Sequence, residues 1–163
     1  MGLQPPSEVV TLLGWLGFSW PEGDEEKMYQ VGQTWLDLAG QLSSQLATAD
    51  AAAQQVWSSG QGEAIEAFRS AWTEDRSPRA NLHDAAEAAT KMGAGMILCA
   101  GIVLALKINV IVQVVLLAIE VASAIAEAVV TFGASLLEIP IFREITKLIL
   151  DQLLGLALEM ILN

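Results

Sequence analysis

The sequence predicts an all-α protein, a multi-helix bundle in which an N-terminal helical hairpin precedes a strongly apolar helical half. Three observations support this prediction. Apolar residues recur at spacings of three and four over long segments, which is the period of an amphipathic helix. The runs that contain Val and Ile are too long, and too rich in Ala and Leu, for strands. Clusters of Gly, Ser and Pro divide the segments into separate helices.

The first long helix is predicted after a short apolar opening segment that ends at Pro21 and Gly23. Asp24 is in position to cap this helix through its carboxylate. An apolar stripe then continues for about 33 residues, or roughly 50 Å of helix. It consists of Met28, Val31, Trp35, Leu38, Leu42, Leu46, Ala49, Ala53 and Val56. A stripe of this length requires a partner helix to cover it.

The turn of the hairpin is predicted at residues 57–62, where two Gly and two Ser follow a Trp. We expect Trp57 to pack into a groove between the long helix and the segment that follows it. We also expect Gly60 or Gly62 to adopt a backbone conformation that other residues resist. The apolar face of the next helix consists of Ala64, Ile65, Phe68, Ala71 and Trp72.

A third helix is predicted to begin at Ser77 and Pro78, a pair typical of the N-cap and the first helical position. The composition then changes near Met92. Most of the charge lies before this residue, and most of the continuous apolar sequence lies after it. We therefore distinguish a hairpin region, residues 1–91, from an apolar helical region, residues 92–163, packed on it within one continuous domain.

The apolar region is expected to contain two helices. The sequence is almost continuously apolar from Gly93 to Phe132, Gly133 is in position to end that run, and Pro140 marks a second break. The last helix is expected from about Ile141 to Leu162, and its apolar face consists of Ile145, Leu148, Ile149, Leu153, Leu156 and Met160. This face and the first stripe are too extensive for one short chain to hide. They predict a dimer or a complex that buries well over ~1,200 Å².

The charge and the reactive side chains exclude several functions. A formal net charge of −11 argues against nucleic acid as a partner, because a binder needs basic residues to displace counterions from phosphates. It also argues against electrostatic docking on anionic lipid. With one cysteine, Cys99, and one histidine, His83, the sequence shows no metal-ligand spacing and no cofactor motif. His83 and Asp84 are adjacent on a helix and should not face each other, so we predict no catalytic, metal or cofactor site.

Residues 56–72 resemble the WXG superfamily of type VII secretion substrates of Gram-positive and mycobacterial bacteria. In that family a helical hairpin carries a Trp-x-Gly motif at its turn, and aromatic residues follow on the second helix. The residues that match are Trp57, then Gly60 or Gly62, then Phe68 and Trp72. The spacing departs from the family motif, because this sequence has Trp-x-x-Gly.

The wider chain is similar to the N-terminal modules of actinobacterial polymorphic toxins, which are related to the N-terminal region of the mycobacterial necrotizing toxin. The similar segments are residues 12–28, the hairpin, and the apolar run that ends at Phe142. This resemblance implies a non-catalytic delivery module that is exported and binds a partner, while a separate C-terminal domain carries the toxicity. It implies two kinds of partner: a small helical protein of the WXG family, or a second copy of the chain, and the type VII secretion machinery.

The resemblance also implies a location that is secreted or in the cell envelope, after a cytoplasmic stage. The N-terminus has no basic region and no cleavage motif of a secretory signal peptide, so we expect a signal-peptide-independent route. The family pairs its turn with a Tyr-x-x-x-Asp/Glu signal. The sequence has one tyrosine, Tyr29, and the residue four positions later is Gln33. We expect a helical partner to supply this half of the signal.

Two alternatives remain, a membrane-inserting module that forms a pore or translocates cargo, and a homo-oligomeric helical scaffold. Between Met92 and Ile119 the one charge is Lys107, although no uncharged run reaches the ~18–20 residues of a clean span. A polar stripe lies opposite Lys107 on a helical wheel and consists of Asn109, Gln113, Glu120, Glu127 and Thr131. We expect this stripe to face water at the edge of a soluble bundle, whereas a pore would turn it inward. The expected basic partners of its carboxylates are Arg69, Arg143 or Lys147.

Overall fold

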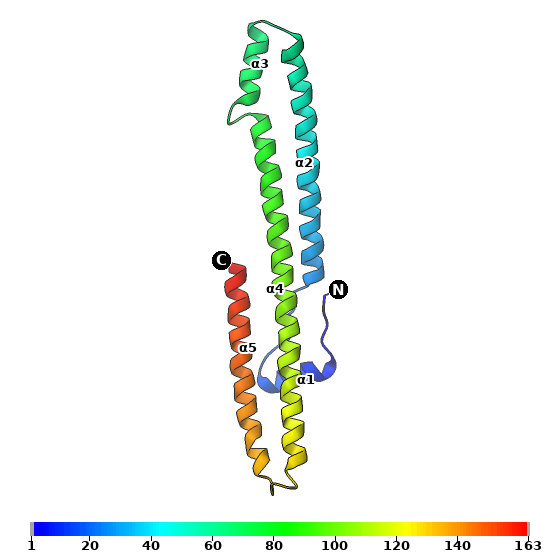
Figure 1. Ribbon diagram of the computed structural model, residues 1–163, viewed down its shortest axis with the longest axis vertical. Helices are drawn as coiled ribbons and strands as arrows, with labels where there is room; N and C mark the ends of the chain where they lie inside the picture. The colour runs from blue at the N-terminus through cyan, green and yellow to red at the C-terminus, as the bar shows by residue number, and fades with distance from the viewer. Residues whose placement is uncertain (1, 163) are drawn as a thin grey trace. The chain divides into compact units, whose positions relative to one another are not determined.

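The computed structural model describes residues Gly2–Leu162, and the regular elements within them are all helices. In chain order they are α1 (Ser7–Leu16), α2 (Glu25–Ser59), α3 (Glu63–Thr73), α4 (Pro78–Glu127), a short 3-10 helix η1 (Ala134–Glu138) and α5 (Ile139–Leu162), as Figure 1 shows. The predicted all-α helical bundle is confirmed.

The chain divides into two compact units, which are described separately below. The hairpin unit, Met28–Leu98, contains most of α2, all of α3 and the first part of α4. The apolar unit combines Met1–Lys27 with Cys99–Asn163. The boundary that the composition suggests, between residues 91 and 92, falls inside α4. The opening segment groups with the C-terminal half rather than with the hairpin.

The helix ends follow local signals in the sequence. The Asp24 carboxylate accepts a hydrogen bond from the backbone N–H of Lys27 at 3.1 Å, and the Ser77 hydroxyl accepts one from the N–H of Ala80 at 3.1 Å. Both contacts satisfy N–H groups that a helix start leaves unpaired. The two caps predicted from the sequence therefore form. The helix that begins at Pro78 continues past the change of composition near Met92, because α4 is one helix of 50 residues.

In the hairpin unit, α2 packs on the first part of α4 through small side chains. The buried residues of α2 are spaced seven apart, Gly32, Ala39, Leu46 and Ala53, and those of α4 are Ala86, Ala89 and Gly93. A seven-residue repeat keeps one seam facing the partner along a slightly supercoiled helix. A Cβ added to Gly32 would lie 2.9 Å from the Gly93 carbonyl oxygen, and one added to Gly93 would lie 2.8 Å from that of Gly32. The two backbones therefore meet at this point.

The apolar stripe predicted on α2 shares Leu46 and Ala53 with this seam, and its other members lie to one side of it. Its largest members stay on the surface, with Val31 43% exposed, Trp35 37%, Leu38 40% and Val56 45%. Burial follows the small residues because two helix backbones approach closely only where the side chains between them are small. The apolar stripe is present on α2, but α4 covers only the residues that it shares with the seam.

In the apolar unit, α1, α4 and α5 share one core. Its buried members are Val9, Leu13 and Leu16 from α1, Val110, Val114 and Leu117 from α4, and Leu150 from α5. The spacings of three, four and seven place each set on one helical face. The opening segment of the chain is thus an amphipathic helix that packs against residues far away in the sequence.

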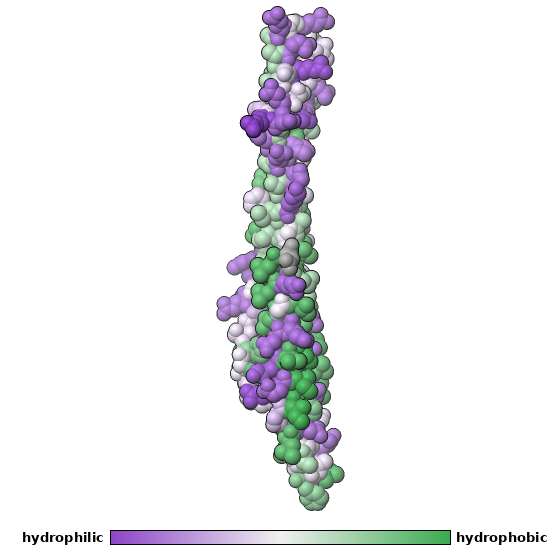
Figure 2. Space-filling model, turned by 90° about the vertical axis from the view of Figure 1, so that its left-hand side faces the viewer, coloured by the Kyte–Doolittle hydropathy of each residue, from purple (hydrophilic) through white to green (hydrophobic). Residues whose placement is uncertain are grey.

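The apolar face predicted on α5 is not the buried one. Leu148 is 64% exposed, Leu156 57% and Met160 61%, whereas Leu150 and Ala157 are buried. This exposure agrees with the expectation that the face is too extensive for one chain to hide. Because α5 is apolar on more than one side, its periodicity alone does not select the buried face. Figure 2 shows hydrophobic side chains gathered over the part of the surface that belongs to the apolar unit, and hydrophilic ones around the turn between α2 and α3.

A buried ion pair joins the opening segment to α4 in the apolar unit. The Lys107 ammonium donates to the Glu25 carboxylate at 2.7 Å, to the Gly23 carbonyl at 2.6 Å and to the Leu3 carbonyl at 3.3 Å. The Glu25 carboxylate also accepts a hydrogen bond from the Leu3 N–H. Lys107 is 2% exposed, so its charge is removed from water. Burial raises the pKa of Glu25, but the hydrogen bonds from Leu3 and Lys107 lower it further, to about 2.

Candidate functional site

The turn between α2 and α3 gathers three aromatic side chains of the hairpin unit. The ring centroids of Trp57 and Phe68 are 5.9 Å apart, and those of Phe68 and Trp72 are 6.0 Å apart, with the ring planes tilted in both pairs. Phe68 and Trp72 are four residues apart on α3, so they lie on one face of that helix. The structure therefore brings together the three aromatic residues that the sequence singled out. Trp57 is half-buried between α2 and α3 rather than enclosed.

A polar network fixes the far end of this aromatic row. The Trp72 indole N–H donates to the Asp50 carboxylate at 2.9 Å, and the Arg79 guanidinium donates to the same oxygen at 2.8 Å. These bonds, that of Arg79 first, hold the pKa of Asp50 below its usual value. The network joins α2, α3 and the start of α4, so it fixes the position of α3 within the hairpin unit.

The two turn glycines have different tasks. Gly62 has φ +129°, a conformation that L side chains rarely adopt, which confirms the expectation for one of the two. Gly60 does not have a positive φ, but a Cβ there would lie 2.5 Å from the tip of the Ile65 side chain. Gly60 thus leaves room for α3, and Gly62 provides the change of chain direction.

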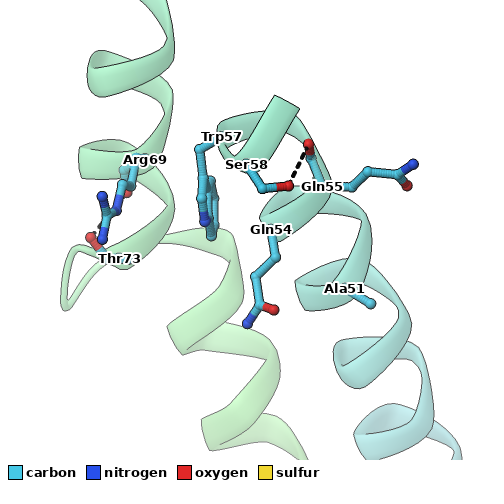
Figure 3. A pocket seen from close by; sticks show the side chains of 7 residues that line it. All are labelled: Ala51, Gln54, Gln55, Trp57, Ser58, Arg69 and Thr73. Carbon is cyan, nitrogen blue, oxygen red and sulfur yellow. Dashed lines mark hydrogen bonds between the residues drawn. The ribbon is translucent and has the colours of Figure 1, made fainter. Parts of the chain in front are cut away.

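An open pocket of about 590 Å³ lies beside Trp57. Its other lining residues are Ala51, Gln54, Gln55 and Ser58 from α2, and Arg69 and Thr73 from α3. Figure 3 shows the Trp57 ring between the two helices, with Arg69 on the α3 side and Gln54 on the α2 side. The lining contains one charged side chain and no carboxylate. The sequence did not single out Arg69 as part of a site.

The polar stripe of α4 is largely accessible in the apolar unit. Glu120 and Glu127 are exposed, and Gln113 is half-buried. Asn109 is exposed and its amide donates to the carbonyl of residue 105 at 2.8 Å, whereas Thr131 lies beyond the end of α4 and donates to the Glu127 carbonyl at 2.9 Å. The stripe and the buried Lys107 do lie on opposite sides of α4. Among the described residues of this unit, no ion pair joins a cation to Glu120 or Glu127.

The basic partners expected for the stripe are engaged elsewhere or unpaired. Arg143 donates to the Trp15 carbonyl at 2.8 Å, and its guanidinium lies 4.9 Å from the centre of the Trp15 ring. Arg69 belongs to the hairpin unit and lines the pocket beside Trp57. The expectation that Arg143 pairs with a stripe carboxylate was wrong, because its guanidinium instead contacts the Trp15 ring and the Trp15 carbonyl on α1.

The connection between α4 and α5 exposes large apolar side chains. Phe132 is 99% exposed, Val129 85%, Val130 80% and Leu137 75%. Phe132 also has φ +51°, a conformation uncommon for a residue other than glycine. Residues 128–137 contain no charge. We call this segment the apolar tip.

Among the described residues, one helical segment, Glu63–Glu127, is long and apolar enough to cross a membrane, judged by its length and composition alone. Its most apolar 18-residue window has a mean hydropathy of 2.6, and 22% of that window is buried. The core helix of a soluble protein can be equally long and apolar, but such a helix is mostly buried. In this chain most of the window is accessible, so an apolar surface remains along α4.

His83, Asp84 and Glu87 form an exposed group on α4, with potential ligand atoms within 4.8 Å of one another. The His83 Nδ1 atom lies 3.6 Å from an Asp84 oxygen. The expectation that these neighbours do not face each other was wrong, because both side chains are exposed and bend toward each other. Glu87 already pairs with Lys91 at 2.6 Å, and this hydrogen bond lowers the pKa of Glu87.

The geometry is that of a helical hairpin module with aromatic residues and glycines at its turn. Large apolar side chains of α2, at Val31, Trp35 and Leu38, remain on its surface. Residues 4–148 match the WXG100-like domain family, which is most of the chain. The chain belongs to this family, and therefore to the WXG superfamily of helical proteins associated with type VII secretion. Members of the family are typically non-enzymatic and usually form helical dimers. No curated protein and no solved structure matches the chain.

Proposed function

We propose that the chain is a non-catalytic export and partner-binding module of a type VII secreted protein, with any toxic activity carried by another domain. The observation that carries this proposal is the row Trp57, Phe68 and Trp72 at the hairpin turn. Three adjoining aromatic side chains, two of them only half-buried and Phe68 38% exposed, provide contact area at little cost in conformational entropy.

The partner in this proposal is a helical protein of the same family or a second copy of the chain. The flank of α2 supports it, because Val31, Trp35 and Leu38 lie one helical turn apart and remain on the surface of the hairpin unit. A second hairpin laid along this flank would bury all three. Exposed apolar side chains that continue along one helix are typical of protein interfaces.

Export of Trp57→Ala from a type VII-competent actinobacterial host tests this function. We expect wild type in the culture medium, none from a host that lacks the type VII ATPase, and strong loss of export for Trp57→Ala. A fully buried Trp costs about 3–5 kcal/mol on truncation, and the half-buried Trp57 should cost about 1–2, which leaves the fold intact. The control is Trp15→Ala, which removes an indole from the apolar unit. Equal export of both variants would contradict the proposal.

A second candidate, a membrane-inserting module, is favoured by one observation, the apolar tip with its uncharged exposed side chains. Leakage from lipid vesicles separates the two candidates. A soluble bundle gives no leakage for wild type or for Glu120→Gln/Glu127→Gln. A pore lined by the polar stripe gives cation-selective leakage for wild type, and the double variant loses the cation preference because the acidic side chains set it. We expect no leakage.

A further inference from the structure

Among the described residues, no carboxylate forms an ion pair with Arg69, which lines the pocket beside Trp57. Five of the eight basic side chains in the chain are engaged: Lys27, Arg79, Lys91 and Lys107 with carboxylates, and Arg143 with Trp15. Arg69 is exposed and makes no ion pair within the described hairpin unit, although Glu66 lies three residues earlier on α3. In a protein with a net charge of −11, an unpaired arginine in a pocket without carboxylates is a distinct local environment.

The rest of the pocket provides hydrogen-bonding groups and one aromatic surface. The Gln54 and Gln55 amides carry N–H donors, and the Ser58 and Thr73 hydroxyls donate to backbone carbonyls of their own helices at 3.1 and 3.0 Å. Those hydroxyl oxygens remain available as acceptors. The Trp57 ring forms an apolar wall between α2 and α3, as Figure 3 shows.

We propose that this pocket binds an acidic segment of another protein chain, whose carboxylate pairs with Arg69 and whose neighbouring apolar side chain packs on Trp57. A guanidinium matches a carboxylate with two parallel hydrogen bonds, which gives both strength and orientation. The inference rests on the proposed function in one respect, that the hairpin turn faces a partner. Beyond the proposed function, the inference specifies that the partner segment carries a carboxylate next to an apolar side chain.

A peptide suits this pocket better than a small anion or a nucleic acid. The pocket is open, so a small carboxylate would bury little area there, whereas a chain segment can cover the pocket and continue along α2 or α3. Nucleic acid would meet the repulsion of a net charge of −11. An acidic peptide carries only a few negative charges, so its pairing with Arg69 outweighs the repulsion from the rest of the protein.

Selection from a library of random 12-residue peptides displayed on phage, with the full chain as target, tests the inference. We expect the enriched peptides to combine an Asp or Glu with an aromatic or large aliphatic residue. The strongest peptide is then synthesised, and its Kd is measured by calorimetry. Its contact with the pocket is followed by the NMR signal of the Trp57 indole N–H. Enrichment of peptides without acidic residues, or no enrichment, would overturn the proposal.

Two arginines provide a matched pair of variants. Arg69→Gln should weaken the peptide about tenfold or more, which is the loss of one charge-assisted hydrogen-bonded pair. Arg76→Gln makes the same change in charge in the loop before α4, outside the pocket, and should change Kd less than about twofold. Arg69→Glu should bind a peptide whose acidic residue is replaced by Lys. Equal weakening by Arg69→Gln and Arg76→Gln would show a general charge effect and reject the site.

The outcomes for this inference and for the proposed function are separable. If Trp57→Ala abolishes export while Arg69→Gln leaves peptide binding unchanged, the proposed function stands and the acidic ligand is rejected. If peptide binding requires Arg69 while Trp57→Ala is exported like wild type, the pocket is a peptide site and the export role is rejected.

Discussion

Lys107 carries the one charge between Met92 and Ile119, and the structure surrounds it with the Glu25 carboxylate and two backbone carbonyls. The Trp20 ring lies 5.8 Å from its ammonium and completes the enclosure. A buried cation is tolerated only when such groups replace its water. The opening segment of the chain is therefore attached to α4 by a charge as well as by apolar packing.

Removing one partner of this pair should be costly. Lys107→Met leaves the Glu25 carboxylate buried without its cation, and we expect the free energy of unfolding in urea to fall by about 3–5 kcal/mol. Glu25→Gln combined with Lys107→Met should recover much of that loss, because no uncompensated charge remains. The control is Lys91→Met, which breaks an exposed pair and should leave the free energy of unfolding nearly unchanged. A Lys107→Met variant as stable as Lys91→Met would contradict the role of the pair.

The same pair has a defined acid dependence. The pKa of Glu25 is about 2 in the folded chain, below its usual 4.5, so its contribution to stability is complete above pH 4.5. The contribution is lost as the pH falls from 4.5 toward 2. The difference in unfolding free energy between wild type and Glu25→Gln should therefore shrink over that window and stay constant from pH 5 to 7. A constant difference down to pH 2.5 would contradict the depressed pKa.

Among the helices, the contact between α2 and α4 in the hairpin unit depends on two glycines. An added Cβ on Gly32 would also lie 2.7 Å from a side-chain carbon of Ile97, so the helices must separate to accept it. We expect Gly32→Ala and Gly93→Ala each to lower the midpoint of thermal unfolding, at a cost of about 1–3 kcal/mol. Gly40 and Gly95 lie on the same two helices with nothing near an added Cβ.

These two glycines are the matched controls for that experiment. Gly40→Ala and Gly95→Ala should raise stability by up to about 1 kcal/mol, since alanine favours the helix and meets no neighbour. If all four alanine variants shift the unfolding midpoint in the same direction, the close backbone contact between α2 and α4 is not present in solution.

Local features were predictable from the sequence, and features that depend on distant residues were not. The caps at Asp24 and Ser77 and the turn at Gly62 depend on a few neighbouring residues, and they form as expected. The seam of α2 was misplaced because Gly32 and Ala39 add little to an apolar pattern, although they permit the closest approach. Glu25, the partner of Lys107, is 82 residues away in the sequence, and no rule of local spacing predicts a contact over such a separation.

The candidate site shows the same division. The aromatic residues and glycines of the turn were identified by their resemblance to a family, and their clustering follows from the hairpin. Arg69 was expected only as a partner of the polar stripe and not as part of this pocket, because a single arginine on an exposed helix face has no pattern of its own. Its place in a pocket becomes visible only when α2 and α3 lie together.

For the whole molecule, exposed apolar side chains predict association. They include the α2 flank at Trp35, the apolar tip at Phe132 and the outer side of α5 at Leu148. Light scattering in buffer without detergent should give a discrete species of at least twice the 17.4 kDa of one chain, or a stable complex with a small helical partner. A monodisperse monomer at micromolar concentration would contradict this prediction. A requirement for detergent would instead favour the membrane candidate.

The pairing of Glu25 with Lys107 also sets an order of events during synthesis. The hairpin unit is continuous in sequence and is nested between the two parts of the apolar unit. The ribosome must add 82 residues after Glu25 before Lys107 exists, which takes about 4–16 s at 5–20 residues per second. During most of that interval the hairpin unit is itself incomplete, because it extends to Leu98, and the apolar side chains of α1 have no core to enter. The nascent chain therefore exposes an amphipathic helix for seconds, long enough for a chaperone or a membrane surface to meet it before α4 does.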